Sequence, residues 1–97
     1  MYVDARNSDV RLAGCDDLTR FSVLADDLEA LAERAGQFGY LAEGVAFVRS
    51  DWIRDSGPRT RAWPAALDAM LAFAESSGWL AEGHVQAHIV LPGAEPA

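Results

Sequence analysis

The chain repeats one six-residue stretch: GYLAEG at residues 39–44 returns as GWLAEG at residues 78–83, 39 residues further along. The match continues upstream without a gap. Residues 28–44 align with residues 67–83 at eight identical and three conservative positions. In both segments the repeated stretch follows a helical pattern of apolar residues. We therefore predict an internal duplication of a helix-turn-strand unit.

The first unit covers about residues 25–50. Its apolar spacing predicts a helix over residues 26–38. Gly39 would end this helix in the left-handed conformation that favours glycine. After the repeated stretch, the mostly apolar run at residues 45–48 is typical of a central strand.

The second unit covers about residues 63–91, with a helix predicted over residues 64–77 and Gly78 as the stop equivalent to Gly39. A last strand follows Gly83. Its residues alternate between two faces, and the apolar face consists of Val85, Ala87, Ile89 and Leu91. Between the two units, from residue 49 to residue 62, no periodic pattern is visible, and we expect a loop.

The N-terminal part of the chain reads as further strands. Residues 1–14 predict a hairpin, and residues 19–24 predict a third strand, although a helix starting at Asp17 fits the same residues. The expected fold is α+β, with a small, largely antiparallel sheet of three to five strands and two helices on one face. We expect one domain over residues 1–91 and a flexible tail over residues 92–97.

Composition excludes some classes of function. The net charge is −7, and all eight basic residues are arginine, so the chain lacks the basic surface that nucleic acids or anionic membranes attract. No signal sequence or membrane span is visible, and Cys15 is the lone cysteine, so we expect a cytoplasmic protein. Eighteen of the apolar residues are alanine. The resulting thin core favours self-association, and we predict a homodimer.

His84 and His88 are the two residues that suggest a metal ligand pair. On a strand they share a face but lie about 13 Å apart, at about 3.3 Å per residue. No other cluster of cysteine, histidine or aspartate completes a zinc site. We expect neither a metal nor any other cofactor, and we regard this histidine face as part of a pocket or an interface.

The segment from Arg49 to Arg61 holds the densest functional chemistry. Four arginines and two aspartates give it a local charge of +2 in an acidic protein. Arginine binds phosphate or carboxylate through two parallel hydrogen bonds, and a tryptophan can stack on a planar ligand. The candidate site residues for an anionic small molecule are therefore Arg49, Trp52, Arg54, Arg59 and Arg61, with His84 and His88.

Three functions are compatible with these features. The first is a non-catalytic, self-associating protein that binds a protein partner. The second is a small enzyme or binding protein for an anionic small molecule at the Arg49–Arg61 segment. The third is a winged-helix regulator whose wing would be residues 79–91, although the acidic composition argues against DNA.

Overall fold

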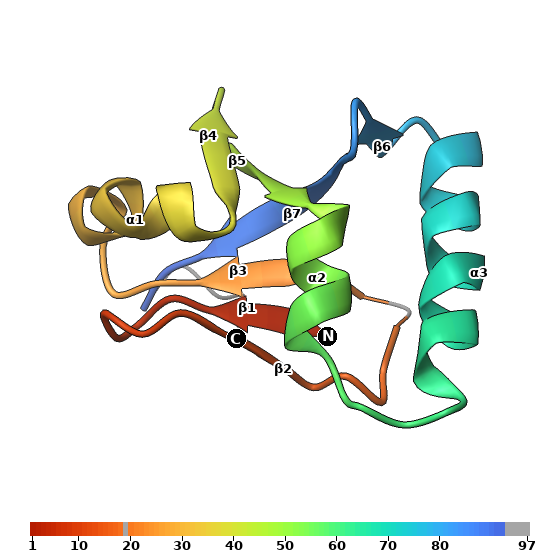
Figure 1. Ribbon diagram of the computed structural model, residues 1–97. Coiled ribbons are helices and arrows are strands. Elements are labelled where there is room, and N and C mark those ends of the chain that lie inside the picture. Colours follow the sequence, from red (N-terminus) through yellow and green to blue (C-terminus); the bar gives the residue numbers. More distant parts are fainter. Residues whose placement is uncertain (19, 93–97) are drawn as a thin grey trace.

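The computed structural model describes residues 1–18 and 20–92, and this part of the chain forms three α-helices, a short 3-10 helix and seven strands (Figure 1). The predicted tail at residues 92–97 lies outside this part except for Pro92. The elements in chain order are β1 (Tyr2–Asp4), β2 (Arg11–Ala13), β3 (Ser22–Leu24), α1 (Leu28–Arg34), η1 (Ala35–Gln37), β4 (Gly39–Ala42), β5 (Val45–Arg49), α2 (Ser50–Ser56), α3 (Trp63–Ser76), β6 (Leu80–Ala81) and β7 (His84–Val90).

The strands form one mixed sheet in the order β2-β1-β3-β7-β5-β4, with β6 also paired to β7. The strands β1, β3 and β7 run parallel to one another, whereas the other pairs are antiparallel. In Figure 1, α2 crosses in front of the sheet and α3 stands at the side where β6 lies. The three helices therefore do not form one layer.

The predicted fold is wrong in its sheet and in its helices. The sheet has seven strands and mixed direction, not three to five largely antiparallel strands, and there are three α-helices in the described part of the chain, not two. Several strands are only two or three residues long, too short to produce a periodic pattern. The parallel pairing of β3 with β7 joins distant parts of the chain, which no local pattern indicates.

Several single elements were nevertheless predicted correctly. The N-terminal hairpin pairs β1 with β2, and the segment that could also have begun a helix contains the strand β3. The helix α3 and the strand β7 lie where the second unit places them, and Val85 and Ala87 are buried on one face of β7.

The two copies of the repeated stretch close the same kind of hairpin. In the first, Glu43 and Gly44 have φ angles of 54° and 82°, and in the second Glu82 and Gly83 have φ angles of 53° and 76°. Two consecutive positive φ angles are the mark of a type I′ turn, whose twist matches that of the flanking strands. The hairpin is therefore shared by both copies, whereas duplication of the whole unit stays a prediction.

The two glycines that begin the repeated stretch differ, which overturns the prediction of equivalent helix stops. Gly78 has a φ of 83°, in the left-handed region, but Gly39 lies in β4 outside that region. A Cβ atom at Gly39 would stand 1.8 Å from the carbonyl oxygen of Phe47 on β5. Gly39 is thus required by the close approach of two backbones.

The core lies on one face of the sheet. Alternate residues of the central strands point to this face and are buried. On the helical side, α1 and α2 each provide one fully buried apolar side chain, and a third comes from the residue that follows η1. These are Val3, Val23, Ala46, Val48, Val85 and Ala87 from the strands and Leu31, Phe38 and Ile53 from the helical segments. Leu67 and Leu71 of α3 complete this cluster, so α3 is fixed to the same core along one side.

Candidate ligand-binding cleft

The segment from Arg49 to Arg61 was predicted to be a loop, but it contains the helix α2, so the prediction of a loop is wrong for residues 50–56. Two of its arginines bond to other groups of the protein. Arg49 donates to the carbonyl oxygen of Gln37 at 2.9 Å, at the end of η1, and Arg54 pairs with Asp68 of α3 at 2.7 Å. These guanidinium groups satisfy groups of the protein itself.

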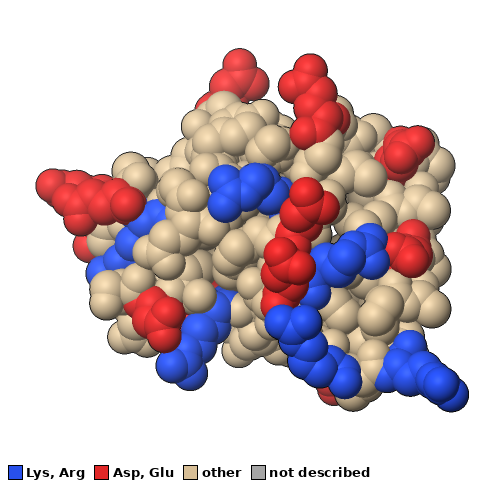
Figure 2. Space-filling model, in the orientation of Figure 1, with Lys and Arg blue, Asp and Glu red and all other residues tan. Residues whose placement is uncertain are grey.

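The remaining predicted site residues of that segment do not line the cleft described below. Trp52 is half-buried, with its ring centroid 6.1 Å from that of Phe38. Arg59 donates to the carbonyl oxygen of Asp55, and Arg61 is exposed. Figure 2 shows basic and acidic side chains interspersed on the face that carries α2, without a continuous basic surface. The role of this segment as an anion site stays a prediction.

The two histidines lie on the same face of β7 but have different surroundings. The ring of His84 lies 5.1 Å from that of Tyr40, which is stacked at 4.9 Å on Phe47. Its Nδ1 atom lies 2.9 Å from the carbonyl oxygen of Glu82. His88 is exposed and lines a large cleft. Only His88, among the seven predicted site residues, belongs to this cleft.

The cleft arises where the sheet forks. One edge of β7 pairs with β6 near its start, through Val85 and Leu80, and with β3 near its end, through His88 and Ser22. Between these two partners the edge of β7 is open to α3. The resulting space has a volume of about 1110 Å³. Cavities of several hundred Å³ that are mainly apolar are the usual sites for small molecules.

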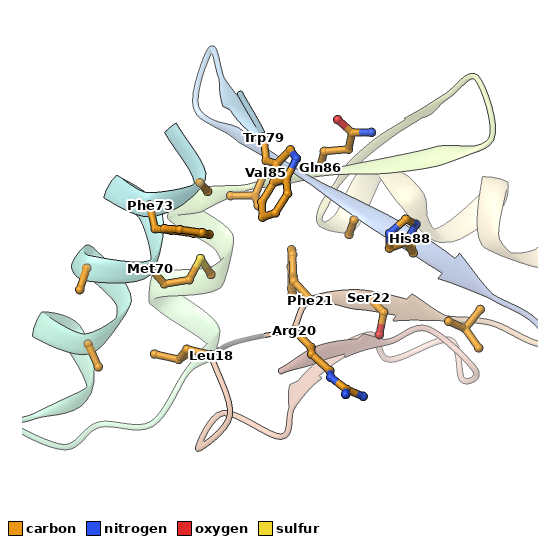
Figure 3. Close-up of a pocket in the computed structure, with 15 residues that line it drawn as sticks. Leu18, Arg20, Phe21, Ser22, Met70, Phe73, Trp79, Val85, Gln86 and His88 are labelled. Carbon is orange, nitrogen blue, oxygen red and sulfur yellow. The ribbon is translucent and has the colours of Figure 1, made fainter. Parts of the chain in front are cut away.

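One side of the cleft is apolar and rich in aromatic residues. It is formed by Leu18, Phe21, Met70, Phe73, Trp79 and Val85. Figure 3 shows Met70 and Phe73 projecting from α3 towards Phe21 and Trp79. The rings of Phe73 and Trp79 meet edge to face at 5.9 Å and 71°, and these residues are 62% and 53% exposed. Such a pair offers a large apolar surface at the mouth of the cleft.

Polar side chains line the strand side of the same cleft: Arg20, Ser22, Gln86 and His88. Within residues 1–18 and 20–92, none of these four side chains has a hydrogen bond or an ion pair with another residue. Arg20 is the only charged residue among the described ones that line the cleft. A mainly apolar cavity with a few polar groups is the pattern expected of a binding site, although Figure 3 shows the amide of Gln86 pointing away from Arg20 and Ser22.

Burial raises the pKa of the Cys15 thiol above its ordinary value of 9.0, so the thiol is held in its less reactive protonated form. Ser22 and His88 stand side by side on neighbouring strands, but the described geometry holds no hydrogen bond between them. Among the described residues, no group of three His, Cys, Asp or Glu residues could hold a metal ion.

Comparison with family models, with curated proteins and with solved structures gave no match to this chain. The helices of the described part include none that is long and apolar enough to cross a bilayer. A proposal about function therefore has to be based on the geometry of the cleft.

Sequence reasoning missed most of the cleft residues. Met70 shares the helical spacing of the buried Leu67, Leu71 and Ala74, yet it is only half-buried and lines the cleft. The available signal was Phe73, a large apolar residue that lies off the inward stripe of its helix. A single exposed aromatic residue is common on a protein surface, and Phe73 becomes informative because Trp79 lies beside it in the structure.

Proposed function

We propose that this chain is a non-catalytic binding protein that takes up a small, mostly apolar molecule in the cleft between α3 and β7. The observation that carries the proposal is the combination, in one space of about 1110 Å³, of an aromatic wall and four polar side chains without partners in the described part of the chain. The non-catalytic role is part of this proposal. A cytoplasmic location remains part of this proposal.

A neutral aromatic probe tests this proposal. Naphthalene-2-carboxamide, titrated into the ¹⁵N-labelled protein and followed by NMR, should shift the amide resonances of α3 and β7 around the cleft. The variant Ala69→Phe places a ring among the lining residues and should abolish the shifts. Ala72→Phe is the matched control, because Ala72 is exposed on the same helix but does not line the cleft.

Two outcomes would contradict the proposal. One is the absence of any shift in the wild type up to millimolar concentrations of the probe. The other is an equal loss of binding in Ala69→Phe and Ala72→Phe, which would place the probe elsewhere on α3.

Self-association is a second candidate function, favoured by the exposure of Phe73, Trp79 and Tyr40. We predict a dimer at micromolar concentration. Sedimentation equilibrium on the wild type and on Trp79→Ser tests this, since loss of an exposed aromatic residue at the interface should weaken the dimer at least tenfold. A monomer throughout the micromolar range would rule this function out.

DNA recognition is not part of the proposal. The segment predicted as a wing, residues 79–91, contains the β6–β7 hairpin, and β7 is paired with β3 and β5 in the sheet. The mixed charges in Figure 2 give the protein no basic surface for phosphates on that face.

A further inference from the structure

Two of the polar side chains of the cleft lie next to each other because their strands are paired in the sheet. Ser22 of β3 and His88 of β7 are register partners on parallel strands, so their side chains stand next to each other on one face. Gln86 precedes His88 by two positions on β7, so the two side chains point to the same face, and Arg20 lies two residues before Ser22, ahead of the start of β3. Figure 3 shows Arg20, Ser22 and His88 on this side of the cleft.

These four side chains are mainly hydrogen-bond donors. Arg20 has five N–H groups, and Ser22, Gln86 and the imidazole of His88 each supply further donors. The described residues that line the cleft include no carboxylate to receive them. A ligand that fits this end must therefore bring acceptor atoms.

Arg20 differs from most arginines of this protein because its guanidinium group has no partner among the described residues. Six of the eight arginines donate to a carboxylate or to a backbone carbonyl oxygen: Arg6, Arg11, Arg34, Arg49, Arg54 and Arg59. Within residues 1–18 and 20–92, Arg20 and Arg61 have no such partner. Of these two, only Arg20 lines the cleft.

We propose that the ligand is an amphipathic monocarboxylate, with an aromatic or aliphatic body against Met70, Phe73 and Phe21 and its carboxylate at Arg20, Ser22 and His88. This inference depends on the proposed function. One guanidinium charge balances one carboxylate, and the two groups match each other in a bidentate geometry. A phosphate dianion would leave an uncompensated charge in a protein whose net charge is already −7.

The test compares two probes of the same shape, naphthalene-2-carboxylate and naphthalene-2-carboxamide, by NMR titration or calorimetry. In the wild type the carboxylate should bind at least tenfold more tightly than the amide, the effect expected of one hydrogen bond to a charged group. Arg20→Gln should reduce this preference to less than twofold, while binding of the amide is kept. Ser22→Ala should reduce the preference by a smaller factor.

Arg61→Gln is the matched control, because it removes the same charge from an exposed arginine outside the cleft. An equal effect of Arg20→Gln and Arg61→Gln would show that only the overall charge matters, and would overturn the inference. Equal affinity of the wild type for both probes would also overturn it, with the proposed function intact. If neither probe binds, the proposed function itself fails.

Discussion

The indole N–H of Trp63 donates a hydrogen bond to the backbone carbonyl oxygen of Cys15, with 2.9 Å between nitrogen and oxygen. This bond joins the first residue of α3 to the segment between β2 and β3. The same two parts of the chain contribute to the apolar side of the cleft, Met70 and Phe73 from α3, and Leu18 and Phe21 from the segment before β3. The hydrogen bond therefore links the two parts of the chain that form this apolar side.

Replacing Trp63 by phenylalanine tests this tether. Trp63→Phe removes the donor and leaves the carbonyl of Cys15 without it, so the free energy of unfolding should fall by about 0.5–1.5 kcal/mol from the hydrogen bond alone. Urea unfolding followed by circular dichroism measures the change. Trp79→Phe serves as the control, because Trp79 is exposed and should change stability by less than about 0.5 kcal/mol. Equal losses in both variants would contradict the tether.

The two glycines at positions 36 and 39 should respond in opposite ways to alanine. Gly39→Ala places a Cβ atom against the backbone of β5, and a core overpacked in this way loses about 1–3 kcal/mol. Gly36 lies in η1, and a Cβ atom added there would meet nothing within 4 Å, so Gly36→Ala should be neutral or stabilising by up to about 1 kcal/mol. Thermal unfolding of both variants decides, and a more harmful Gly36→Ala would contradict the described register of β4 and β5.

The two type I′ turns predict a pair of stabilising substitutions. Asparagine adopts a positive φ more readily than glutamate, so Glu43→Asn and Glu82→Asn should each raise the melting temperature slightly. Gly44→Ala should lower the free energy of unfolding by about 1–2 kcal/mol, because alanine is strained in the left-handed region. Since the space around Gly44 is open, the whole loss would come from the backbone. A neutral Gly44→Ala would show that the turn adopts another form.

The ion pair of Asp4 and Arg6 predicts a small loss of stability in acid. The hydrogen bond from the Arg6 side chain, at 2.9 Å, lowers the pKa of the Asp4 carboxyl below its ordinary value of 3.8. A carboxyl whose pKa is lower in the folded state stabilises the fold above its unfolded pKa. That contribution is lost as the pH falls through the folded pKa.

Half of the Arg6 side chain is exposed, so screening by solvent keeps the contribution of this pair to stability small. Arg6→Gln should remove this loss of stability between neutral pH and pH 3. Arg61→Gln is the control, since Arg61 is exposed and is not among the groups that lower the pKa of Asp4. Urea unfolding at the two pH values measures it. An unchanged acid dependence in Arg6→Gln would rule out this role of Asp4.

The strand β7 and the helix α3 were predictable because their apolar residues repeat over seven and fourteen residues. The helix α2 was not, since only Trp52 and Ile53 of its seven residues are large and apolar. Gly39 was assigned a left-handed role because it aligns with Gly78. Sequence alignment cannot distinguish a glycine needed for its φ angle from one needed for the space around it.

The cleft could not be predicted from local patterns. Its polar end depends on the register that places Ser22 beside His88, and its apolar side requires α3 to lie across the fork of the sheet. Both relationships join residues that are distant in sequence. The sequence nevertheless contained one usable sign of the site, the aromatic side chain of Phe73 on the outward face of an otherwise regular amphipathic helix.

The short strand β6 has a consequence for how the protein moves. It consists of two residues, and next to it the amide of Gln86 donates to the carbonyl oxygen of Trp79 at 2.8 Å. Segments with so few backbone bonds open at a much lower free energy than the strands of a core. The amide of Gln86 should therefore exchange its hydrogen with solvent faster than the amides of β5, which has a strand on each side. Such local opening would widen the entrance at Trp79 without disturbing the core, so a guest molecule could enter and leave while the rest of the domain stays folded.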